Sequence, residues 1–207
     1  MSIFDMFDGN EPTESKQSSN DGGTWTKEKR KAVGQRREDA AIARIRERVT
    51  NGDHLLQGLH FIEPVSEEIC ETDGIYVCGN TIHVVEIKSK NFDYLYGNTD
   101  TGYWYLTYKD KTVKSDNVFR QISRQMRILM ENTERHFHVV GHIFINNTSP
   151  NVVMDIVGTM QDDITLHTDV DELCALLNTD STKNPGLVTY LADLDKYNKS
   201  LIPADWT

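Results

Sequence analysis

Residues 71–91 read ETDGIYVCGNTIHVVEIKSKN, and this stretch decides the fold. Gly79 and Asn80 are a two-residue turn signal between two runs of alternating apolar residues, the usual pattern of a tight β-hairpin. With these two residues as the loop, Asp73 lies directly opposite Glu86 on one face of the sheet. Their Cβ atoms are then roughly 4.5–5.5 Å apart. The hairpin therefore pairs two carboxylates where a purely structural sheet has no reason to do so.

A third charged residue shares this face. Lys88 follows Glu86 by two residues, and side chains alternate along a strand. Like charges directly opposed across a sheet are destabilising, and a divalent cation between Asp73 and Glu86 would compensate their repulsion. The alternative is a structural ion-pair triad in which Lys88 neutralises the two acids. That alternative leaves a negative charge uncompensated on an otherwise apolar face, so we favour a metal site.

The chain is long enough, at 207 residues, for one domain with its own core. Its longest apolar run, Val139 to Ile145, is too short to span a bilayer, and its first residues lack the features of a secretory signal. The three cysteines (Cys70, Cys78 and Cys174) are dispersed without a metal-binding spacing. This pattern favours a reduced protein over a disulfide scaffold or a zinc ribbon. We therefore expect a cytoplasmic protein that does not interact with a membrane.

The chain divides into three parts by composition. Residues 1–23 are rich in Ser, Asn, Gly, Asp and Glu and carry a net charge of −4, which predicts a disordered acidic tail. Its apolar segment 3–7 is a candidate docking peptide for a protein partner, although we favour a chance apolar start. Residues 24–147 are expected to form the core. Residues 148–207 are expected to supply a C-terminal strand and helices that complete or cover it.

The charge distribution bears on the choice of partner. The net charge of −10 alone would argue against nucleic acid, but residues 24–145 carry +1 and residues 146–207 carry −7. Basic residues also cluster, in one run of Lys27, Lys29, Arg30, Lys31, Arg36 and Arg37 and in another of Arg120, Arg124 and Arg127. A locally basic surface on an acidic protein is compatible with phosphate binding.

Hydrophobic periodicity predicts the elements. Ala41, Ile42, Ile45 and Val49 fall at helical spacing and predict a helix over 27–49. Strands are predicted over 55–65, 72–78, 81–90, 103–109, 137–145 and 151–157. Further helices are predicted from a cap at Asp116 or Asn117 to about Glu131, over 169–178 and over 186–197. This order indicates an α/β fold with a mixed central β-sheet flanked by helices.

The two carboxylates suit phosphodiester hydrolysis. Mg²⁺ prefers oxygen ligands and takes only one or two carboxylates, with waters and substrate oxygens completing its shell. Asp73 and Glu86 supply that pair, and the backbone carbonyl of Ile87 is a candidate third ligand. Lys88 would then lie beside the metal-bound water, where it can position or activate it or stabilise charge on the phosphate. Such a metal lowers the pKa of bound water and neutralises developing charge.

The order of motifs extends beyond the hairpin. Asp73, twelve residues and then Glu-x-Lys resemble the PD-(D/E)XK nuclease signature. Around it lie Tyr96-Gly97, Tyr103-Trp104, an Asn117-x-x-x-Gln121 motif opening a helix, and upstream Gly34 followed by Glu38 ahead of apolar residues. Together these resemble the nuclease-related domain, NERD, over about residues 34–145.

The resemblance implies a restriction-endonuclease-like core, a nuclease activity dependent on Mg²⁺ or Mn²⁺, and nucleic acid, with DNA favoured, as partner. The catalytic residues that it implies are Glu38, Asp73, Glu86 and Lys88, with Gln121 in support. The metal ligands would be Asp73, Glu86, Ile87 and Glu38. Without the resemblance, Glu38 is equally an acid near a helix N-terminus and Gln121 an exposed polar residue.

Two other functions stay open at this point. One is a catalytically silent nucleic-acid-binding or adaptor module on the same fold. The other is a Holliday-junction-resolvase-like enzyme, which would use the same core and usually acts as a symmetric dimer.

Two aromatic and histidine patterns have simpler explanations. Tyr103-Trp104-Tyr105 could stack nucleic-acid bases, but alternating aromatics more often pack a sheet, and we favour packing. His136, His138 and His142 share one side of a predicted strand. Because residues 136 and 142 would be roughly 20 Å apart along a strand, they cannot share one zinc ion.

Overall fold

The computed structural model describes residues 26–147, 152–158 and 161–202. A five-stranded sheet is its centre. Across this sheet the strands are β1 (Leu55–Ile62), β2 (Ile69–Cys78), β3 (Thr81–Lys88), β7 (His138–Ile145) and β9 (Ile164–His167). The first three strands run antiparallel, whereas β3, β7 and β9 are parallel. The sheet is therefore mixed, as predicted.

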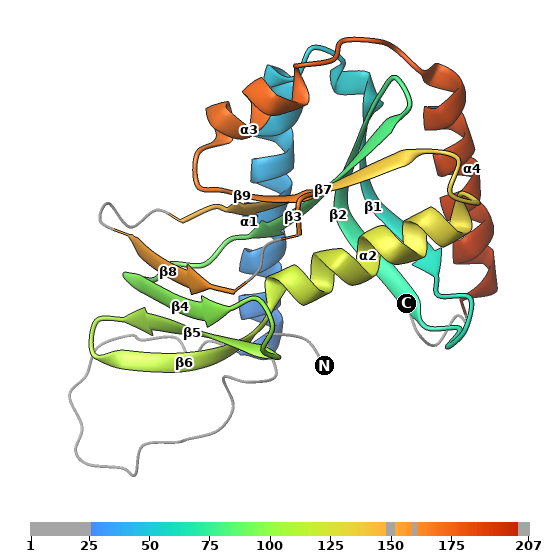
Figure 1. The fold of residues 1–207 in the computed structure, drawn as a ribbon. Helices are drawn as coiled ribbons and strands as arrows, with labels where there is room; N and C mark the ends of the chain where they lie inside the picture. The colour runs from blue at the N-terminus through green and yellow to red at the C-terminus, as the bar shows by residue number, and fades with distance from the viewer. Residues whose placement is uncertain (1–25, 148–151, 159–160, 203–207) are drawn as a thin grey trace.

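A smaller sheet lies beside the first (Figure 1). Its order is β6 (Lys111–Asp116), β5 (Tyr103–Tyr108), β4 (Tyr94–Asn98) and β8 (Val153–Val157). A side chain at Gly97 would collide with the indole of the buried Trp104, which is its partner across β4 and β5. The glycine of the Tyr-Gly motif is therefore required by the close packing of this tryptophan.

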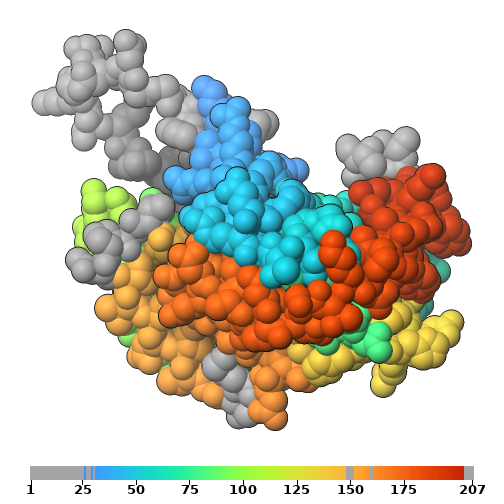
Figure 2. Space-filling model, turned by 90° about the horizontal axis from the view of Figure 1, so that it is seen from above, coloured from blue at the N-terminus to red at the C-terminus, as the bar shows by residue number. Residues whose placement is uncertain are grey.

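Helices cover both faces of the large sheet. They are α1 (Lys27–Arg48), α2 (Val118–Asn132), α3 (Val170–Leu177) and α4 (Pro185–Leu201), with a 3-10 turn η2 at Gly52–His54. Helix α2 packs on one face, and α1 and α3 pack together on the other. Figure 2 shows α1 and α3 side by side, seen from above. Helix α4 lies along β1. No helix of the described ranges is long and apolar enough to cross a membrane.

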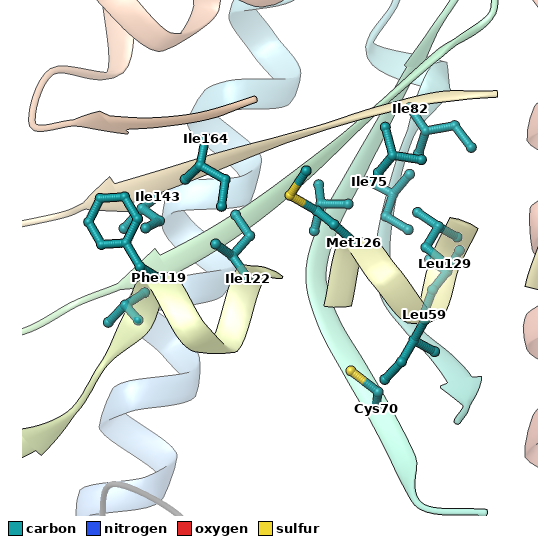
Figure 3. Packing of buried hydrophobic residues seen from close by; sticks show 14 of the residues in the cluster. Leu59, Cys70, Ile75, Ile82, Phe119, Ile122, Met126, Leu129, Ile143 and Ile164 are labelled. Atoms are coloured by element: carbon teal, nitrogen blue, oxygen red, sulfur yellow. The ribbon is translucent and has the colours of Figure 1, made fainter. Parts of the chain in front are cut away.

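The main core lies between α2 and the large sheet. Figure 3 shows Ile122 and Met126 of α2 pointing toward the apolar side chains of the sheet. A Cβ atom at Gly141 of β7 would lie 2.7 Å from the sulfur of Met126 and 3.0 Å from Ile122. The helix can therefore approach β7 closely only because position 141 lacks a side chain. This contact places the first turn of α2 over the end of β3.

The predicted α/β class is confirmed, but three strands were missed. Strand β4 contains Gly97 and ends at Asn98, β6 is mostly polar, and β9 has only four residues. The first strand ends at Ile62, three residues before the predicted end, because Glu63 and Glu68 close a turn by backbone hydrogen bonding. The predicted tail at 1–23 and its segment 3–7 lie outside the described residues. The domain boundaries stay a prediction.

A chain of buried imidazoles lies on the α3 side of the sheet. His83 Nδ1 is 2.9 Å from His142 Nε2, and His142 Nδ1 is 3.3 Å from His167 Nε2. Cys78 Sγ lies 3.1 Å from His83 Nε2 at the other end. A neutral imidazole has one donor and one acceptor, so every ring can be satisfied if all bonds run in one direction. This cluster gives no signal in the sequence because its members come from four different strands.

Burial keeps these rings neutral. It lowers the pKa of His142 to about 3 and, with the nearby His138, lowers the pKa of His83 to about 4. In the unfolded chain both rings take up protons near pH 6.5, whereas in the folded chain they do not. The unfolded state therefore binds more protons below that pH, and the stability contributed by the neutral rings is lost as the pH falls.

We expect the free energy of unfolding to decrease between about pH 7 and pH 5.5, by up to about 1.4 kcal/mol per pH unit for each ring. Urea denaturation of the wild type and of His83→Gln/His142→Gln at both pH values would measure this. The raised pKa values of Glu38 and Asp73 make the free energy of unfolding increase as the pH falls, and they do so in both proteins. The difference in pH dependence between the two proteins therefore reports the two histidines alone. Equal pH dependence in the two proteins would contradict the expectation.

Candidate active site

The hairpin ladder ends where the predicted site begins. The expected register is confirmed from the turn to the last pair of the ladder, Gly74 with Val85. Beyond it β2 continues along β1, whereas β3 continues beside β7, so the two strands separate as a fork (Figure 1). Asp73 and Glu86 are the first residues past this last pair. The two carboxylates therefore lie where the sheet opens.

Asp73 bridges the fork with its side chain. Its Oδ2 accepts a hydrogen bond of 2.6 Å from the backbone N–H of Ile87, in place of a strand-to-strand backbone bond. Burial and then the charge of Glu86 raise the pKa of Asp73 well above its usual range, although Lys88 and the Ile87 amide oppose them. The carboxylate is thus held in place in an environment that disfavours its negative charge.

Glu86 is fully buried, with a relative exposure of 0%, and is surrounded by donors. Lys88 Nζ donates to its Oε1. Gln121 Nε2 donates to the same oxygen at 2.7 Å, and Gln125 Nε2 donates to Oε2 at 2.7 Å. The structure therefore brings four of the predicted site residues together at the fork: Asp73, Glu86, Lys88 and Gln121.

Gln125 is a site residue that sequence analysis missed. It is buried, and its Nε2 also donates to the Glu71 carbonyl at 3.1 Å, which ties α2 to both branches of the fork. Its Oε1 has no hydrogen-bond partner among the described residues, so it can accept from a water or a ligand. The sequence does contain one indication of this role, because Gln125 follows Gln121 by four residues and so lies on the same face of α2.

Glu38 approaches from the opposite helix. It is half-buried on α1, one turn before the buried Ala41 and Ile42. Burial raises the pKa of Glu38, and the charge of Glu86 adds to this while Lys88 opposes it. Glu38 is thus close enough for electrostatic interaction with the other charged residues of the site.

Two lysines supply the positive charge. Burial would lower the pKa of Lys88, but Glu86, Asp73 and Glu38 outweigh it and raise that pKa. Burial, followed by the charge of Lys88, lowers the pKa of Lys90 to about 8. Lys90 was not singled out from the sequence, although it repeats the spacing of Lys88 after Glu86.

The donor set fits a hard divalent cation. Three carboxylates surround one ion-paired lysine, and all the candidate ligands are oxygens, which Mg²⁺ and Mn²⁺ prefer. Among the described residues, no three His, Cys, Asp or Glu side chains are placed to hold a metal together. A cation here would therefore rest on Asp73 and Glu86, with backbone, water and substrate oxygens completing its shell. Two carboxylates are the usual number for Mg²⁺.

The arginines predicted as a basic cluster on α2 are mostly engaged. Arg124 pairs with Glu63 at 2.7 Å and with Glu68 at 2.5 Å, and Arg127 also pairs with Glu63. These hydrogen bonds lower the pKa of Glu63 to about 2. Arg120, by contrast, is exposed and forms no ion pair with another described residue. Only one of the three arginines is thus available for a phosphate.

Comparison with known families identifies the fold. Residues 33–148, more than half of the chain, match the family model described as the nuclease-related domain, NERD. The chain belongs to the NERD family. The matched range contains the fork and the first turns of α2, so the predicted family is confirmed together with its α/β nuclease-like core. Comparison with curated proteins and with solved structures gave no match.

In this NERD protein we expect Lys88→Met to lower the free energy of unfolding by about 3–5 kcal/mol, because it leaves the buried Glu86 charge without its cation. The double variant Glu86→Gln/Lys88→Met should regain much of this loss, since neither charge is then buried. Urea denaturation at neutral pH measures both, with the exposed Lys111→Met as the control. A double variant as unstable as the single one would contradict the coupling.

Proposed function

We propose that this NERD protein is a metal-dependent nuclease that hydrolyses phosphodiester bonds, with DNA as the favoured substrate. The observation that supports this most is the pair of carboxylates at the fork, with Lys88 bonded to one of them. A structural hairpin gains nothing from a buried and a half-buried acid side by side at the opening of a sheet. A site for Mg²⁺ or Mn²⁺ gives both acids a role.

Each residue has a separate task in this proposal. Asp73 and Glu86 would hold the cation, which would supply a water of lowered pKa and neutralise charge on the phosphate. Lys88 points its ammonium group at Glu86 and can donate to a phosphate oxygen or position the attacking water. Gln121 and Gln125 hold the Glu86 carboxylate in one orientation, so they are positioning residues. Glu38 adds a carboxylate from α1 that can accept a proton from the water.

One observation favours the second candidate, a catalytically silent nucleic-acid-binding or adaptor module. Glu86 Oε1 already accepts from Lys88 and Gln121, so both of its lone pairs are used. Only Oε2, which accepts from Gln125, keeps a lone pair for a metal. A nuclease would have to bind its metal through this remaining lone pair of Glu86, or release Lys88 or Gln121 from Oε1. A junction-resolvase-like enzyme would use the same residues and differ in its preference for branched DNA.

Cleavage of single-stranded, duplex and branched DNA and of RNA tests the proposal. We expect cleavage with Mg²⁺ or Mn²⁺, none with EDTA, and a loss of about a hundredfold or more in Asp73→Asn and in Lys88→Ala. Asp100→Asn and Lys111→Ala, both exposed and away from the fork, should cut like the wild type. If no substrate is cut, or if the site variants cut normally, the nuclease proposal is wrong. Binding without cleavage would favour the silent module.

Metal binding can be measured without activity. A cation that binds the folded state alone raises the melting temperature in a concentration-dependent way. We therefore expect millimolar Mg²⁺ to stabilise the wild type and to stabilise Asp73→Asn much less. The matched control is Asp100→Asn, which should respond like the wild type. A shift of the same size in all three proteins would count against a site at Asp73.

A further inference from the structure

The small sheet exposes one of its faces. Its other face is buried by Leu95, Trp104 and Leu106. On the exposed face, Tyr96, Tyr103 and Tyr105 have relative exposures of 44%, 42% and 44%. The expectation that the aromatics of β5 are packing residues is therefore correct for the tryptophan and wrong for the two tyrosines. Figure 1 places this sheet beside the beginning of α2.

The tyrosines form a compact platform with a lysine. Tyr96 on β4 lies directly across from Tyr105 on β5, and Tyr105 lies across from Lys114 on β6. Lys114 Nζ lies 3.3 Å from the centre of the Tyr103 ring. At the far edge Asp155 of β8 pairs with Tyr96, so the platform is positive at one edge and negative at the other. We refer to Tyr96, Tyr103, Tyr105 and Lys114 as the tyrosine platform.

The fold does not require rings at the β5 positions of the platform. In the next row of the same face, Tyr94 of β4 lies across from Thr107 of β5, and Thr107 lies across from Thr112 of β6, the two hydroxyls hydrogen-bonding at 2.9 Å. Small β-branched residues therefore suffice on β5 and β6. Clustered exposed aromatic side chains are informative about binding, whereas single ones are not.

We propose that the tyrosine platform binds a single-stranded segment of nucleic acid by base stacking, and this rests on the nuclease function proposed above. A tyrosine ring can stack on the face of any base, and such stacking tolerates any sequence. Lys114 on the platform supplies a cation for the phosphates. Bases within a duplex are already stacked on one another, so the platform selects unpaired ones.

The platform is continuous with the candidate active site. Asp116 at the end of β6 lies across from Tyr103. Lys90 is near enough to both Asp116 and Lys88 for their charges to act on its pKa. The next residue, Asn117, caps α2, whose first turn carries Gln121 to Glu86. A strand stacked on the platform can therefore pass Lys90 and present a phosphate to Lys88.

Fluorescence anisotropy with a labelled oligothymidine of about 20 nucleotides, in EDTA so that no cleavage occurs, tests the inference. We expect Tyr96→Leu/Tyr105→Leu to weaken binding about tenfold or more, because two stacking surfaces are lost. Tyr96→Phe/Tyr105→Phe keeps the rings and should bind like the wild type. The control is Tyr190→Leu/Tyr197→Leu, which removes two exposed tyrosines from α4. Circular dichroism and thermal melting verify that each variant is folded.

The outcomes separate this inference from the nuclease proposal. Binding that depends on the platform in a protein that cuts nothing would support the inference and leave the nuclease proposal wrong. If the wild type cuts nucleic acid but the leucine variant binds the oligonucleotide as tightly as the wild type, the nuclease proposal is supported and this inference is wrong. The inference is also overturned if the wild type does not bind the oligonucleotide, if it prefers the matching duplex, or if the phenylalanine variant binds as weakly as the leucine variant.

Discussion

The burial of the Glu86 carboxylate is the constraint on which the rest of the site depends. A fully buried negative charge is tolerated only when donors surround it, and here Lys88 comes from the same strand while Gln121 and Gln125 come from α2. These bonds fix the rotation of α2 as well as its distance from the sheet. Because Gln125 also bonds to the Glu71 carbonyl, the same helix holds both branches of the fork.

The fork itself follows from two competing pairings of β2. Its C-terminal half pairs with β3, and residues 69–76 pair with β1, so β2 must leave β3 once these two neighbours diverge. Asp73 stands at this point, and its carboxylate takes over the backbone N–H of Ile87 that would otherwise lose a partner. The opening creates space between strands without leaving an unsatisfied amide. The two acids therefore lie where β2 and β3 separate.

The two faces of the large sheet are specialised in different ways. The α2 face carries the charged site at one end and an apolar core along the rest, whereas the α1 and α3 face is apolar apart from the imidazole chain. Glu38 is the exception, since it lies on α1 close enough to Lys88 and Glu86 for their charges to act on its pKa. The small sheet lies beside the large one, next to the beginning of α2. Its tyrosine platform, Asp116 and Asn117 lead directly into α2.

Local patterns in the sequence determined the class of the fold, the turn of the hairpin, its register and the carboxylate pair, because turn chemistry and alternation are properties of neighbouring residues. The order of motifs was sufficient to indicate the NERD family. The sequence also identified Gln121, but not Gln125, whose role depends on how α2 is rotated against the sheet. Only the tertiary structure decided which arginines are occupied by Glu63, which tyrosines face solvent, and that His83, His142 and His167 meet. Each of these depends on contacts between strands and helices far apart in the chain, and such contacts leave no periodic signal in any single segment.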